Sequence, residues 1–121
     1  MQRMKLTLAA FVVGLSDQLA LAADPFDGRW RLSIEVESGP CVQPLLAYLV
    51  IISRSQVSLD PLTSMTTGAD LYGTVDPEGF VVASVQRGTD TADGTGTIKG
   101  TLGKGRWHHE DCKGTWILKR R

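Results

Sequence analysis

The residue types best suited to metal or acid–base chemistry are concentrated in one short run, His108-His109-Glu110-Asp111-Cys112. Imidazole, carboxylate and thiolate groups are the usual ligands of zinc and related ions. Successive side chains of a β-strand point to opposite faces, however, so two adjacent histidines on a strand cannot easily bind one ion. His108 and His109 are therefore weak candidates for a metal or haem site, and we predict a protein without a cofactor.

Other catalytic groupings are sparse. Serine is frequent, but no serine stands in the Gly-x-Ser-x-Gly turn that presents a nucleophile in many hydrolases. Glu35 and Glu37 could form a carboxylate pair, but they alternate with apolar residues of a predicted strand and would face solvent. The sequence therefore predicts a binding or interaction protein and not an enzyme.

The two cysteines, Cys41 and Cys112, are predicted to form a disulfide bond. An even number of cysteines in an exported chain normally pairs, and a Cys-x-x-Cys redox spacing is absent. Closing a loop of about 70 residues is expected to stabilise the fold by about 4 kcal/mol on the chain-entropy account.

Residues 1–23 have the layout of a cleavable secretory signal peptide. A basic start is followed by an apolar stretch over 6–15 and by the small-residue site Ala20-Leu21-Ala22-Ala23. The apolar stretch is shorter than the roughly 20 residues that a membrane span needs. We therefore expect residues 24–121 to form one exported domain, periplasmic or extracellular in a bacterium, with no integral membrane segment after cleavage.

The formal net charge of the 121-residue chain is zero, with 13 basic and 13 acidic residues. This balance gives no general field for nucleic acid or an anionic membrane, and we predict no nucleic-acid partner. The charge is uneven, because the segment 95–121 holds seven basic residues against Glu110 and Asp111. We interpret this segment mainly as a solvated face with a basic chain end.

Hydrophobic alternation with a period of two predicts strands along most of the remaining chain. In the first strand, the residues expected on the buried face are Trp30, Leu32, Ile34 and Val36. A hairpin is predicted from 69–75 and 80–87, joined by the turn Asp76-Pro77-Glu78-Gly79.

A second hairpin is predicted to start at 95–102, with a turn at Gly103-Lys104-Gly105 and a return strand from Arg106. Its expected inward row is Gly96, Ile98, Gly100 and Leu102. The last strand is predicted over 114–120, and no window longer than a turn shows a helical period. The fold class is therefore all-β: a small antiparallel meander barrel or sandwich of seven or eight strands with one disulfide.

One strand departs from alternation, because the segment 45–52 is apolar on both faces. A loop such as 60–68, or a second sheet, could cover the outer face. Otherwise that face is a candidate interface with a protein partner or in a homodimer, since an exposed apolar strand favours aggregation. The candidate interface residues are Leu45, Ala47, Leu49 and Ile51.

A Gly-x-Trp motif occurs three times, at Gly28-Arg29-Trp30, Gly105-Arg106-Trp107 and Gly114-Thr115-Trp116. The first copy resembles the Gly-x-Trp that opens the first strand of calycin-type barrels, such as lipocalins, avidins and bacterial inhibitors of secreted metalloproteases. That resemblance implies a calycin-like barrel in which a basic residue of the last strand packs across Trp30. The candidates for that basic residue are Lys119, Arg120 and Arg121.

A longer pattern runs from Phe26-Asp27-Gly28-Arg29-Trp30 through Cys41 to Cys112-Lys113-Gly114-Thr115-Trp116. This pattern resembles small exported β-domain proteins of alphaproteobacteria that have no established function. The resemblance spans residues 24–121 and implies an exported, disulfide-linked β-domain.

The interior of such a barrel is barely wide enough for its own side chains or one small ligand. We expect a filled core, with a hollow barrel that carries a small apolar ligand or haem as the alternative. A protein that resembles periplasmic protease inhibitors is a second alternative, although few residues precede the first strand. The candidate barrel-plugging or ligand-contacting residues are Trp30, Trp107, Trp116 and Tyr72.

Overall fold

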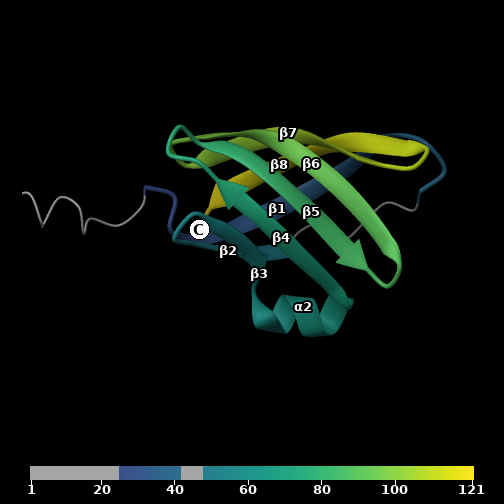
Figure 1. Ribbon diagram of the computed structural model, residues 1–121, viewed down its shortest axis with the longest axis horizontal. Helices are drawn as coiled ribbons and strands as arrows, with labels where there is room; N and C mark the ends of the chain where they lie inside the picture. Colours follow the sequence, from purple (N-terminus) through teal and green to yellow (C-terminus); the bar gives the residue numbers. More distant parts are fainter. Residues whose placement is uncertain (1–24, 42–47) are drawn as a thin grey trace, which may run out of the picture.

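The computed structural model describes residues 25–41 and 48–121, which form a closed antiparallel barrel of eight strands (Figure 1). Each strand pairs with the next in chain order, and the last pairs with the first. The strands are β1 (Gly28–Ser38), β2 (Tyr48–Ser53), β3 (Gln56–Leu59), β4 (Ala69–Val75), β5 (Phe80–Arg87), β6 (Asp90–Lys99), β7 (Leu102–His109) and β8 (Cys112–Arg120). The predicted all-β class is confirmed, with a barrel rather than a sandwich.

Strand β1 confirms the predicted alternation. Trp30 and Leu32 are buried inside the barrel, whereas Glu35 and Glu37 are exposed on its outer surface. The strand pairs with β2 on one side and with β8 on the other, which closes the barrel. Glu35 and Glu37 therefore do not form an enclosed carboxylate pair.

The β4–β5 hairpin has the predicted strands and turn. Asp76 organises this turn, because its Oδ1 accepts hydrogen bonds from the backbone N–H groups of Glu78 (3.0 Å) and Phe80 (2.9 Å). Gly79 has φ of 95°, a backbone conformation that glycine adopts without steric cost.

The predicted turn between the next two strands is wrong. The chain reverses at Gly100 and Thr101, where Gly100 has φ of 62°, and Gly103 and Gly105 lie within β7. Leu102 consequently starts β7 and is 38% exposed rather than inward-facing. Glycine is required at 103 and 105 because neighbouring inward side chains leave little room for a Cβ atom, and not because the chain turns there.

A short helix, α2 (Pro61–Thr67), follows β3 where the sequence predicted only a loop, and Figure 1 shows it outside the barrel. Asp60 caps its N-terminus by accepting from the Leu62 N–H (3.1 Å), and Gly68 ends it with φ of 71°. The helix has no buried residue. Because the helix packs no residue into the core, its sequence shows no apolar period that would predict it.

One end of the barrel, where β1 starts and β8 ends, is closed by large side chains. Trp30 is fully buried there, and the strand ends around it contribute Ile52, Val75 and Ile98. The predicted basic residue is Arg120, whose guanidinium carbon lies 4.5 Å from the centre of the Trp30 ring. Arg120 also donates to the backbone oxygens of Asp27 (2.8 Å) and Pro25, which fastens the residues that precede β1 to the barrel.

The predicted disulfide joins Cys41 to Cys112 at the opposite end, with 6.0 Å between the Cα atoms. Cys41 follows β1, and Cys112 starts β8. The bond therefore links two neighbouring strands just beyond the last residues at which they pair.

Candidate functional site

A cavity of about 350 Å³ occupies the half of the barrel nearer the disulfide. Its wall is predominantly apolar and includes inward residues from β1 to β8. Among the most deeply buried side chains, Val50 lines this cavity, whereas Trp30, Ile52, Val75 and Ile98 lie in the closed end. The expectation of a completely filled core is therefore wrong for this half of the molecule.

The cavity exists because the inward positions of β5 and β6 carry small side chains. Ala83, Val85, Ala92 and Gly94 all line it, and register pairs Ala83 with Gly94 and Val85 with Ala92. At this level along the barrel axis, two adjacent strands thus contribute only small side chains to the interior. Large inward residues at these positions would fill a barrel of eight strands.

Trp107 and Trp116, two of the candidate plug or ligand-contacting residues, line the cavity, and contact with a ligand stays a prediction. Each is paired across the β7–β8 ladder with a glycine of the other motif: Gly105 with Trp116, and Trp107 with Gly114. A Cβ atom on Gly105 would overlap the Trp116 ring, and one on Gly114 would lie 2.8 Å from Trp107 Nε1. The glycine of each motif therefore makes room for the tryptophan of the other.

Hydrogen bonds fix the orientation of Trp107. Its Nε1 donates to the backbone oxygens of Glu35 (3.0 Å) and Thr115 (3.2 Å). The indole consequently lies with its polar edge on the backbone of β1 and β8, so its apolar ring is available to the cavity.

Two other candidates do not line the cavity. Trp30 plugs the closed end, where its Nε1 donates to the Phe26 backbone oxygen (2.9 Å). Tyr72 is 60% exposed on the outer face of β4, so its prediction as a plug or ligand contact is wrong. The reason is strand parity, because Leu71 and Gly73 occupy the inward positions on either side of it.

The cavity opens at a polar mouth formed by the β5–β6 and β7–β8 turns. Arg87, Asp90, Thr91 and His109 are the polar residues of this rim. His109 Nδ1 donates to the Thr91 backbone oxygen (2.8 Å), and its Nε2 lies 3.9 Å from a carboxylate oxygen of Asp90. This rim presents charged and hydrogen-bonding groups to anything that enters the apolar interior.

The two adjacent histidines point to opposite faces. His109 lines the cavity, whereas His108 is exposed on the outer surface. Both cysteines are engaged in the disulfide, and the described residues contain no group of three His, Cys, Asp or Glu side chains that could hold a metal ion.

The candidate interface on β2 is only partly described. Leu49 and Ile51 are half-buried within the barrel wall, while Leu45 and Ala47 lie outside the described residues. Two strongly exposed apolar side chains lie instead on α2, where Leu62 is 66% and Met65 is 80% exposed. Partner and homodimer contacts at β2 stay predictions.

In the parts of the chain that the structure covers, no helix is long and apolar enough to cross a membrane. Comparisons with protein-family models, with curated proteins and with solved structures found no match to this chain.

Proposed function

We propose that this protein is an exported, non-enzymatic binding protein that holds one small, largely apolar molecule inside its barrel. The observation that supports this proposal is the apolar cavity of about 350 Å³ beside Trp107 and Trp116. Ligand pockets typically measure roughly 300–1,000 Å³ and combine an apolar wall with a few polar groups. The disulfide is compatible with the oxidising environment of an exported protein.

The volume limits the ligand to a small molecule. It is somewhat more than twice that of a cavity of about 150 Å³ that accommodates benzene. A ligand of one or two rings, or a short acyl chain, suits this space. A polar group at one end of that ligand would meet Arg87, Thr91 and His109 at the mouth.

The two alternatives have less support. A haem is a large rigid disc, of which this cavity would hold only a part, although His109 could supply an axial nitrogen. A protease-inhibitor-like role would use a free segment before the first strand. Here Arg120 holds Pro25 and Asp27 against the barrel.

The test is a titration of the oxidised protein with N-phenylnaphthylamine, a neutral and apolar fluorescent probe. Energy transfer should quench tryptophan emission saturably at a stoichiometry near one, because Trp107 and Trp116 line the cavity. Ala83→Leu should weaken binding by at least about tenfold, since the added carbons occupy the cavity. Addition of haemin to the same samples tests the haem alternative through its Soret band.

Val82→Leu is the matched control, because Val82 precedes Ala83 on the outer face and is 49% exposed. It should leave probe affinity unchanged. Non-saturable quenching, or equal loss of affinity in both variants, would contradict a ligand site inside the barrel.

A further inference from the structure

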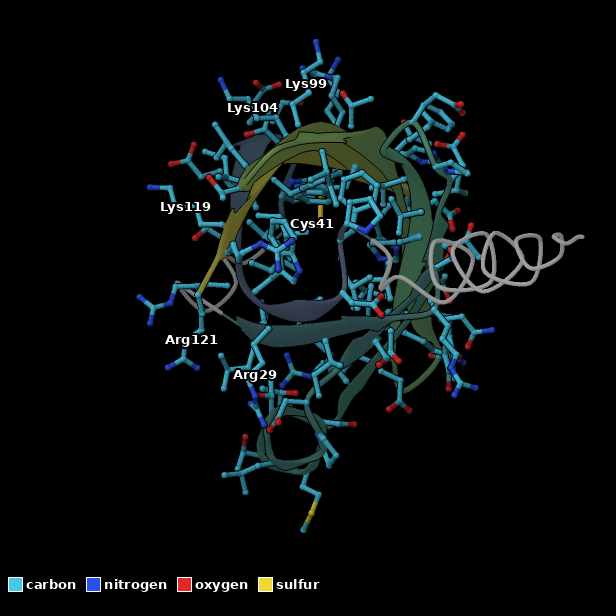
Figure 2. All side chains as sticks on the ribbon, turned by 90° about the vertical axis from the view of Figure 1, so that its left-hand side faces the viewer. Arg29, Cys41, Lys99, Lys104, Lys119 and Arg121 are labelled. Atoms are coloured by element: carbon cyan, nitrogen blue, oxygen red, sulfur yellow. A yellow bond between two sulfur atoms is a disulfide. The ribbon has the colours of Figure 1, made fainter. Side chains whose placement is uncertain are left out.

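The barrel carries a strongly cationic outer surface that the proposed cavity does not use. Six basic residues project from the wall near the closed end, and we call this surface the basic face. Its residues are Arg29, Arg31, Lys99, Lys104, Lys119 and Arg121. All six are exposed, and Figure 2 shows the labelled ones following the outer wall from Lys99 at the top, through Lys104 and Lys119 on the left, to Arg121 and Arg29 below.

Strand register brings these residues together from distant parts of the sequence. Arg31 pairs with Lys119, Lys119 pairs with Leu102, and Leu102 pairs with Lys99, which forms one row across four strands. The neighbouring row runs from Ser33 through Ile117 and Lys104 to Thr97. Neither row contains a carboxylate.

The cations of these rows are not neutralised by neighbours. Within the described residues, Arg31, Lys99, Lys104, Lys119 and Arg121 form no ion pair. Arg29 at the edge of the face lies 3.5 Å from Asp60, and Glu35 first appears one row beyond Ser33. A protein of zero formal charge therefore holds a local positive field on this side.

Apolar side chains stand among these cations. Leu102 is 38% exposed between Lys99 and Lys119 in the first row, and Ile117 is 39% exposed beside Lys104 in the second. Basic residues interspersed with exposed apolar ones suit the boundary between lipid headgroups and acyl chains. A single-stranded nucleic acid would instead favour several aromatic side chains for base stacking, whereas the two rows contain none and only Phe80, 47% exposed, adjoins them through its pairing with Thr97.

We infer that the basic face docks on an anionic lipid surface through β7 and β8, with Lys104 and Lys119 at the headgroup phosphates and Leu102 and Ile117 at the acyl boundary. The cavity mouth lies at the opposite end of the barrel, beside the disulfide. Docking would therefore leave the mouth open. The inference is independent of whether the cavity holds a ligand.

The test is co-sedimentation of the purified, disulfide-bonded protein with vesicles of phosphatidylcholine alone or with about 30% phosphatidylglycerol. Binding should require the anionic lipid and should fall as salt is raised from about 0.05 to 0.5 M. The apolar segment 6–15, where retained, would add binding to both kinds of vesicle, so the difference between them is the quantity to measure.

Neutralising variants locate the surface. Lys104→Gln and Lys119→Gln should each weaken the anionic-lipid partition coefficient by about fivefold, and the double variant by about 25-fold. Lys113→Gln is the matched control, because it removes an exposed charge from β8 near the disulfide end. It should stay within about twofold of the unchanged protein.

Three results would overturn the inference. They are no difference between the two vesicle types at low salt, an equal loss in the Lys113→Gln control, and tighter binding to a single-stranded oligonucleotide with the same variant pattern. The last result would reassign the basic face to nucleic acid.

Discussion

At the scale of single residues, Arg120 connects the end of β8 to the start of β1 and the residues before it through three contacts. Its guanidinium stacks on Trp30 and donates to two backbone oxygens before β1. Arg120→Lys keeps the charge but loses the planar, forked donor, so we expect a loss of about 1–3 kcal/mol in the free energy of unfolding. Equilibrium urea unfolding measures this loss. Arg121→Lys, at the exposed neighbouring position, is the control and should be neutral; equal stability of both variants would refute the role assigned to Arg120.

The reciprocal glycine–tryptophan pairs make a second residue-scale prediction. A Cβ atom at Gly105 would overlap both the Thr95 backbone oxygen and the Trp116 ring, which cannot move away without repacking the core. Gly105→Ala should therefore cost about 2–3 kcal/mol of unfolding free energy. At Gly94 the closest atom to an added Cβ is 3.2 Å away, so Gly94→Ala should cost less than half as much. Urea unfolding monitored by tryptophan emission compares the two, and similar costs would show that the ring does not set the requirement for glycine.

At the scale of elements, local patterns predicted those strands whose two faces differ in polarity. Strand β1 and the β4–β5 hairpin follow from alternation and from a turn rich in Pro and Gly. The β6–β7 turn was misplaced because glycine has two uses: Gly100 reverses the chain, whereas Gly105 makes space for Trp116. Helix α2 was missed because it has no buried residue and hence no apolar period.

The cavity could not be predicted from any one strand. It results from small inward residues that are paired on adjacent strands, Ala83 with Gly94 and Val85 with Ala92. The strand register decides which residues are paired in this way. The basic face likewise depends on register, because Arg31 and Lys99 are far apart in sequence. The alternation in sequence indicates which side chains face inward, but it does not indicate which of them meet.

The disulfide supports a prediction about the β1–β8 junction. Cys41 and Cys112 are separated by 71 residues, so the bond should contribute about 4 kcal/mol by restricting the unfolded chain. Reduction should lower the urea midpoint accordingly. The Cys41→Ala/Cys112→Ala double variant should resemble the reduced protein and should not respond to reductant. An unchanged midpoint after verified reduction would show that barrel closure already supplies this restraint.

At the scale of the whole molecule, every strand pairs only with neighbours in chain order except for the closure of β8 on β1. That closure is non-local, so it carries the greatest cost in chain entropy. The residues that flank this closure are close together, because the Arg121 N–H donates to the Arg29 backbone oxygen (2.9 Å) and Arg120 donates to the Pro25 backbone oxygen. A short linker between residues 121 and 25 could therefore turn the closure into a hairpin.

We expect a circular permutant that starts at residue 112 and ends at residue 111 to fold into the same barrel. The new ends would lie in the β7–β8 turn, where Glu110 and Asp111 are exposed, and the Cys41–Cys112 bond would still form. Its refolding rate should stay close to that of the parent, because the β8–β1 pairing becomes local while the β7–β8 pairing becomes the non-local closure in its place. Far-UV circular dichroism and stopped-flow refolding measure the two expectations. A control permutant opened within β1, between Leu32 and Ser33, should fail because its new ends interrupt a paired strand rather than a turn. If the first permutant also fails to fold, the barrel requires an intact β7–β8 turn.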